Sequence, residues 1–211
     1  MALLAMALLY YLMWDTLVRK NSLNWLMIPL VSLLFLPLGL MELRWSVMES
    51  KISAVVDDIS GKKGGSVHCQ RFSEAFFDTK VSEAGHVSSD KPNVAVVNYE
   101  QCQHIFAWLE RGKGEPSREQ MHAIHVLTHE AVHVSGQYNE AVTECTAINR
   151  DYLTVKELGG SLEQGHQLAS SYYTGIWPGM PKEYILPGCL IEPKFDSILV
   201  LQEAVKKAAS K

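Results

Sequence analysis

The chain has 211 residues, with 19 Lys and Arg against 23 Asp and Glu and a formal net charge of −4. This charge balance offers no basic footprint, so we expect no nucleic-acid partner. The length allows one domain plus appendages. Residues 1–41 hold almost no charge, and residues 42–211 carry nearly all of it, so we expect two unlike parts.

The first part contains two uncharged runs. Met1–Trp14 has fourteen residues without a charge, and Leu23–Met41 has nineteen. At about 1.5 Å per residue the second run spans roughly 29 Å, which is close to one hydrocarbon core. The first run reaches that length only if it extends to Val18 and carries Asp15 near the interface. We expect residues 1–41 to form a two-helix membrane anchor.

Two other interpretations of these runs stay open. The first run can be a signal peptide, although it lacks a basic start and a small-x-small cleavage site. The second run can be a buried core helix, although Pro29, Pro37 and Gly39 disfavour a helix in water.

The charges between the two runs predict the orientation of the anchor. Arg19 and Lys20 lie there, and the positive-inside rule places such a loop in the cytoplasm. The N-terminus and residues 42–211 then lie outside. We expect a membrane protein whose partners include the lipid bilayer and whose main domain is extracytoplasmic.

Residues 42–211 are long enough for one globular core, and their pattern predicts a mainly helical α+β fold. In chain order we first expect a strand or short helix at 51–58, a loop at 61–66, a helix at 71–77, a loop at 82–93 and a buried strand at 93–98. Four helices should follow, at 99–111, from Ser117 to a stop at Gly136, at 140–158 and at 161–173. We expect the chain to end with a turn at 177–181, an extended piece at 184–189 and a terminal helix at 195–209. Ser117 with Gln120 and Ser161 with Gln164 form capping boxes.

The four cysteines all fall in this second part: Cys69, Cys102, Cys145 and Cys189. An even count without a C-x-x-C pair, on a predicted exterior, indicates two disulfides. Three pairings are possible. We favour Cys69–Cys102, which brackets the strand region, and Cys145–Cys189, which ties the helix after residue 140 to the C-terminal segment. Four buried free thiols are the alternative.

The most informative residues are His129, Glu130 and His133, which form the pattern HExxH. Residues four apart share a helix face, so the two imidazoles can bind one Zn²⁺ ion. Glu130 projects beside them, where it can accept a proton from the attacking water. The neighbouring positions are uncharged and mostly apolar, as a helix buried under an active site requires.

A third ligand can come from the next helix. Gly136 can end the HExxH helix, and Asn139 can cap a second helix that opens with Glu140. This helix–turn–helix can bring Glu140 over the two histidines. Glu144, one turn later, would hydrogen-bond a ligand histidine and fix its tautomer.

These motifs resemble those of zincin metallopeptidases, in particular the gluzincins, in which a Glu on a following helix is the third zinc ligand. Glu140 and Glu144 fit the E-x-x-x-D/E spacing of that helix. The wider pattern over Val67–Asp196 also resembles that of small actinobacterial membrane-anchored HExxH proteins. The resemblance implies a zincin-like fold in which a strand beside the HExxH helix holds the substrate backbone.

The chain departs from the gluzincin pattern in one respect. The gap from His133 to Glu140 is shorter than in most gluzincins, and Asn139 stands where metzincins have a His or Asp. Whether Glu140 or Glu144 is the third ligand therefore stays open.

These observations predict a zinc metallopeptidase that hydrolyses a peptide or protein substrate. Two imidazoles and one carboxylate leave a zinc position open for water, whose pKa falls towards about 7. Glu130 takes the proton and delivers it to the leaving amine. An oxyanion donor is also needed, and the candidates are His166, Tyr172, Tyr173 and Tyr184. We interpret His122 and His125 as structural or surface histidines.

A second function stays open. The domain can be an inactive or structural zinc-binding scaffold or interaction module at the cell surface. Glu130 favours an enzyme, because a structural zinc site has no use for a base at that position.

Overall fold

The computed structural model describes residues 2–19, 23–72, 74 and 84–191, and it divides into two compact units, Met1–Met48 and Glu49–Lys211. The chain begins with α1 (Ala2–Arg19) and α2 (Leu23–Ser60). Among the described residues, one helix is long and apolar enough to cross a membrane, and it is the part of α2 from Ile28 to Ser60. The sequence predicts two such helices, so α1 as a second span stays a prediction.

Helix α2 continues well beyond the apolar run in its first half. Its last turns belong to the second unit, where Ile52, Val55, Val56 and Ile59 are buried. Their spacing of i, i+3, i+4 and i+7 places them on one helix face. The stretch 51–58, for which the sequence leaves a strand or a short helix open, is therefore helical.

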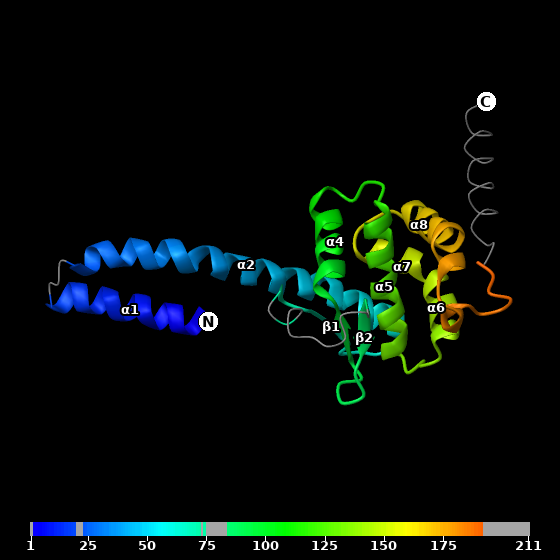
Figure 1. Ribbon diagram of the computed structural model, residues 1–211, viewed down its shortest axis with the longest axis horizontal. Coiled ribbons are helices and arrows are strands. Elements are labelled where there is room, and N and C mark those ends of the chain that lie inside the picture. The colour runs from blue at the N-terminus through cyan, green and yellow to red at the C-terminus, as the bar shows by residue number, and fades with distance from the viewer. Residues whose placement is uncertain (1, 20–22, 73, 75–83, 192–211) are drawn as a thin grey trace, which may run out of the picture. The chain divides into compact units, whose positions relative to one another are not determined.

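The second unit contains a small sheet of β1 (Ser66–Cys69), β2 (Gly85–Val87) and β3 (Val94–Val97), in the order β1-β3-β2 (Figure 1). β1 runs parallel to β3, and β2 runs antiparallel to it. The strand predicted at 93–98 is confirmed as β3. The loop predicted at 82–93 is partly wrong, because β2 lies there. Three residues that include a glycine carry no alternation from which a strand can be recognised.

The two edges of this sheet differ in what covers them. The outer edge of β1 is closed by α2, because the backbone N–H groups of Val67 and Cys69 donate to the side chains of Ser53 and Glu49 at 2.9 and 2.7 Å. β2 forms the other edge, and within the described part of the chain no strand pairs with its outer side. An open strand edge can pair with an extended peptide.

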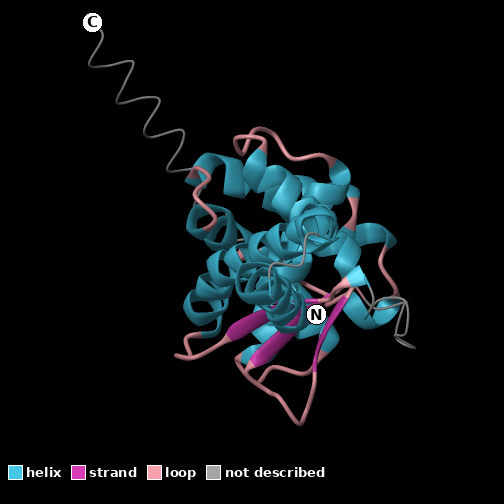
Figure 2. Ribbon diagram, turned by 90° about the vertical axis from the view of Figure 1, so that its left-hand side faces the viewer, coloured by secondary structure: helices cyan, strands magenta, loops and turns pink. Residues whose placement is uncertain are grey.

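The rest of the described chain is mainly helical. It forms α4 (Tyr99–Glu110), α5 (Arg118–Val134), α6 (Glu140–Ile148), α7 (Asp151–Glu157) and α8 (Leu162–Gly175), followed by the short 3-10 helices η1 (Trp177–Gly179) and η2 (Lys182–Tyr184). α5 is central, since it contacts α4, α6, α7, α8, β2 and β3, and every residue from Ala123 to Val134 is buried (Figures 1 and 2).

Two predicted elements differ from those observed. The single helix predicted at 140–158 is broken at Asn149 and Arg150, where the Asn149 amide donates to the Cys145 carbonyl and the Arg150 guanidinium donates to the Ile59 carbonyl. Such side-chain bonds to backbone compete with helix continuation. The extended piece predicted at 184–189 begins in η2 and then turns. The terminal helix predicted at 195–209 and most of the helix predicted at 71–77 lie outside the described residues.

Candidate metal centre

The centre is built on the turn between α5 and α6. α5 begins at the predicted capping box, in which the Ser117 side chain accepts from the backbone of Gln120 and the Gln120 side chain accepts from the backbone of Ser117. α5 ends at Val134, and Gly136 has a φ of +100°, a left-handed conformation that favours glycine. The Asn139 side chain accepts from the backbone N–H of Val142 and caps α6. The predicted caps and the stop glycine are confirmed.

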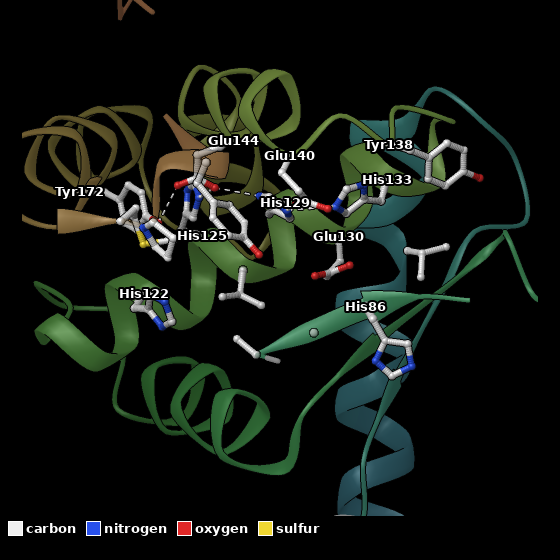
Figure 3. Close-up of a pocket in the computed structure, with 17 residues that line it drawn as sticks. His86, His122, His125, His129, Glu130, His133, Tyr138, Glu140, Glu144 and Tyr172 are labelled. Atoms are coloured by element: carbon white, nitrogen blue, oxygen red, sulfur yellow. Dashed lines mark hydrogen bonds and ion pairs between the residues drawn. The ribbon is translucent and has the colours of Figure 1, made fainter. Parts of the chain in front are cut away.

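This turn brings together the three side chains expected to bind zinc. The Nε2 atoms of His129 and His133 lie 3.0 Å apart. Glu140 Oε2 lies 3.1 Å from Nε2 of His129 and 3.4 Å from Nε2 of His133 (Figure 3). The three residues form a group that could hold a metal ion.

The spacing of these three atoms fits a tetrahedral zinc ion. Ligand atoms bound at about 2.0–2.1 Å in tetrahedral geometry lie about 3.3–3.4 Å from one another. The observed separations of 3.0, 3.1 and 3.4 Å therefore need side-chain shifts of only about 0.3 Å. Two imidazoles and one carboxylate are also a donor set that zinc accepts.

The other ring nitrogen of each histidine is held from behind. Nδ1 of His129 lies 2.8 Å from Oε2 of Glu144, and Nδ1 of His133 lies 2.7 Å from the backbone carbonyl of Gln137. Both partners are acceptors, so each Nδ1 carries a proton, and each Nε2 can offer a lone pair to a metal ion once the proton held between Nε2 of His129 and Glu140 is displaced. Hydrogen bonds of this kind orient the histidine ligands in metal sites. Glu144 thus hydrogen-bonds the candidate ligand His129, and its role behind a bound metal ion stays a prediction.

A cavity of about 530 Å³ opens over the three candidate ligands. It is lined by the β2 region, by one face of α5 and by residues that follow α8, and its lining includes Ala84, Gly85, His86, Val87, His122, Val126, Glu130, Tyr138, Met180, Pro181 and Tyr184. The edge strand and the candidate ligands therefore face the same space.

Glu130 lies between α5 and β2 at the wall of this cavity (Figure 3). Only 4 % of it is exposed. A Cβ atom on Gly85 would lie 2.8 Å from Cγ of Glu130, so the missing side chain of Gly85 leaves the room that Glu130 occupies. Glu130 is not part of either group of candidate metal ligands in the described chain.

Glu144 is the centre of a buried cluster that the sequence did not reveal. Its Oε2 lies 3.1 Å from Nε2 of His125, and its Oε1 accepts a 2.8 Å hydrogen bond from the Tyr172 hydroxyl. The other nitrogen of His125, Nδ1, lies 2.9 Å from Oδ2 of Asp151. His125, His129 and Glu144 also come close enough to hold a metal ion. The only sequence signal was the place of His125 one helical turn before His129.

The protonation states of His125 and Glu144 indicate that this second group is held together by hydrogen bonds and not by a metal ion. Both nitrogens of His125 face carboxylate oxygens, and an imidazolium ion can donate to both. Burial by itself lowers the pKa of His125, but the charges of Asp151 and Glu144 and their hydrogen bonds outweigh burial and raise this pKa to about 10. Burial by itself raises the pKa of Glu144, but the charge of His125 outweighs burial and keeps this pKa well below its usual range.

The candidate ligands have shifted pKa values as well. Burial lowers the pKa of His129, but hydrogen bonds to Glu140 and Glu144 outweigh it and raise this pKa to about 9. Burial and the neighbouring charge of His129 lower the pKa of His133. The hydrogen bond from His129 lowers the pKa of Glu140. In the metal-free protein one proton is therefore shared where the three atoms converge, and a metal ion must displace it.

The four candidates for an oxyanion donor differ in their position relative to the cavity and in what their side chains contact. Tyr173 donates to the backbone carbonyl of Cys189, and His166 stacks on Tyr152, and neither lines the cavity. Tyr172 lines the cavity, but it is fully buried and its hydroxyl is bonded to Glu144. Tyr184 lines the cavity, and its ring centre lies 5.9 Å from that of His129.

Both favoured disulfides are present, and the described residues contain no free cysteine. Cys69–Cys102 joins β1 to α4. Cys145–Cys189 joins α6, directly after Glu144, to the segment that follows Tyr184. The second disulfide therefore links the helix of the third candidate ligand to the segment that carries the remaining oxyanion candidate.

Comparison of the chain with protein-family models, with curated proteins and with solved structures found no match.

Proposed function

We propose that this protein is a membrane-anchored zinc metallopeptidase whose catalytic group is Glu130. The observation that carries the proposal is the convergence of Nε2 of His129, Nε2 of His133 and Oε2 of Glu140 within 3.4 Å, at the floor of a cavity that Glu130 also lines. A metal ion held by three protein atoms keeps a position open for chemistry, whereas structural zinc sites have four protein ligands.

Zinc would supply two things at this site when bound: a lowered pKa for water, towards about 7, and polarisation of a carbonyl oxygen. The protein supplies the base. Glu130 accepts the proton of the attacking water and delivers it to the leaving amine. Its place against Gly85 fixes the carboxylate next to the edge strand, where a substrate carbonyl has to lie.

The substrate in this proposal is an extended peptide. Within the described residues no strand pairs with the outer edge of β2, and Ala84 to Val87 all line the cavity over the candidate ligands. A peptide that pairs with β2 as an added strand gains backbone hydrogen bonds, and its next residues pass over the metal position. This is the role that the resemblance to zincins assigns to the strand beside the HExxH helix.

Tyr184 is our candidate for the oxyanion donor. Burial, and then the charges of Glu140 and Glu130, raise the pKa of its hydroxyl, so this group keeps its proton at neutral pH. A protonated hydroxyl at the cavity wall can donate to the oxygen that becomes negative when water attacks the peptide bond.

The location in this proposal is the outer face of a membrane. One helix near the N-terminus has the length and composition of a membrane span, and the domain contains two disulfides, which persist in oxidising compartments. We propose that α1 is the second helix of the anchor, with Arg19 and Lys20 on the cytoplasmic side.

The test uses the full chain, purified in detergent. Wild type is expected to contain one zinc ion per chain and to cleave members of a diverse peptide library. Glu130→Gln should keep its zinc and lose about 10²–10⁴-fold in hydrolysis, because it removes the proton acceptor. Glu119→Gln is the matched control, since Glu119 is an exposed residue of the same helix and lies outside the cavity.

Two outcomes would overturn the proposal. A chain that binds no zinc has no metal centre of this kind. A zinc-loaded wild type that cleaves no library peptide, and whose function in the cell survives Glu130→Gln, would be a binding module with a structural metal.

A further inference from the structure

We propose that His125 is a positioning residue: it is an imidazolium ion, held between Asp151 and Glu144, that fixes the orientation of the metal ligand His129 through Glu144. This inference rests on the proposed metal centre. It adds His125, Asp151 and Tyr172, from α5, α7 and α8, behind Glu144, and neither the HExxH motif nor the resemblance assigns these three residues a place behind the centre.

The first step of the argument is the hydrogen bonding of Glu144. This carboxylate accepts from His125 and His129 at one oxygen and from the Tyr172 hydroxyl at the other, with distances of 3.1, 2.8 and 2.8 Å. A carboxylate that accepts three hydrogen bonds has little freedom to rotate. Its contact with Nδ1 of His129 therefore defines both the tautomer and the plane of that ring.

The second step is charge. Asp151 and Glu144 are both buried, with side-chain exposures of 0 and 1 %. Burial raises the pKa of Asp151, and the charge of His125 opposes this shift. A cation between two buried carboxylates stabilises their charged forms, and His125, at 2 % side-chain exposure, is placed there. The described residues provide no Lys or Arg that bonds to either carboxylate.

The third step is packing. The His125 ring lies on the Tyr172 ring with 3.7 Å between the centres and 19° between the planes. This face-to-face contact suits a cation on an aromatic ring. Tyr172 therefore contacts His125 with its ring and Glu144 with its hydroxyl. It holds in place both residues that connect Asp151 to His129.

Asp151 has no hydrogen bond to His129, and the chain of hydrogen bonds that connects the two residues runs through His125 and Glu144. Two variants of the full chain test this path, His125→Gln and Asp151→Asn. The matched control is Thr146→Val, which keeps the size of the side chain and removes a part-buried 2.7 Å hydrogen bond from Thr146 to the Val142 carbonyl within α6, outside the path.

Two measurements are made on each chain. One is the zinc dissociation constant, from competition with a chelator, and the other is the visible absorption spectrum after loading with Co²⁺, which reports ligand geometry. Both path variants should bind zinc about 10–100-fold more weakly, as is usual when a partner behind a metal ligand is lost. Both should also shift the Co²⁺ bands. The control should change neither, although it loses some stability.

The outcomes separate this inference from the proposed function. If wild type binds neither Zn²⁺ nor Co²⁺, the proposed metal centre itself fails. If wild type binds both, and the path variants match Thr146→Val in zinc affinity and in spectrum, the metal centre stands and the positioning role of His125 is refuted. Asp151→Asn keeps the volume of the side chain, so it decides the question even where His125→Gln does not fold.

Discussion

Glu140 and Glu144 lie one turn apart on α6 and contact the same histidine, yet their surroundings differ sharply. The side chain of Glu140 is 38 % exposed and faces Nε2 of His129 from the cavity. The side chain of Glu144 is 1 % exposed and bonds Nδ1 of the same ring from the core. The comparison shows that the side of the imidazole that a carboxylate reaches, and not its residue type or its helix, decides whether it faces the candidate metal position or the core.

The largest expected difference between the two carboxylates is in stability. Glu144→Ala should lower the free energy of unfolding by about 3–5 kcal/mol, because it leaves the charge of His125 and the hydroxyl of Tyr172 without a shared acceptor. Glu140→Ala should cost less than about 1 kcal/mol in the absence of metal, since its side chain is partly in water. Urea unfolding of the full chain in a chelating buffer measures both, and equal losses would contradict the comparison.

The next difference is in metal binding. Glu140→Ala should weaken zinc binding by about 100-fold or more, because a direct ligand is lost, whereas removal of a supporting partner costs about 10–100-fold. Glu144→Gln is the variant to set beside it, since it keeps a side chain of the same size in the core. Chelator competition gives both constants. A chain that loses zinc with Glu144→Gln and retains it with Glu140→Ala would make Glu144 the ligand.

The last prediction concerns pH, and it tests both carboxylates together. Burial lowers the pKa of His129, and the bonds to Glu140 and Glu144 raise it to about 9 in the metal-free protein. Zinc must displace this proton, so zinc affinity should rise by about tenfold per pH unit between pH 7 and 9 and level off above. Calorimetry in buffers of different ionisation enthalpy should detect about one proton released per zinc at pH 7. A zinc affinity that stops rising near pH 6.5 would show that the two carboxylates do not raise the pKa of His129.

The sequence predicts the parts of the centre that depend on local geometry. His129 and His133 share a helix face, and a glycine stop, a short turn and an asparagine cap bring Glu140 back over them. Each of these steps spans at most eight residues, so helix periodicity and capping rules describe it.

The parts that the sequence did not predict depend on packing between distant elements. Asp151 lies 26 residues after His125, and Tyr172 lies 28 residues after Glu144. No period connects these pairs, because the contacts of α5 with α7 and α8 bring them together. β2 was missed for a different reason, since its three residues become a strand only by pairing with β3.

The short turn between α5 and α6 also has a consequence for the order in which the centre assembles. The three candidate ligands lie within residues 129–140, so closing one short loop gathers them, and such closure costs little chain entropy. The supporting residues on α7 and α8, and the Cys145–Cys189 disulfide, require contacts across 26 to 44 residues. Contacts over longer separations form more slowly. The ligands can therefore meet while the chain is still folding, and the shell behind them closes afterwards.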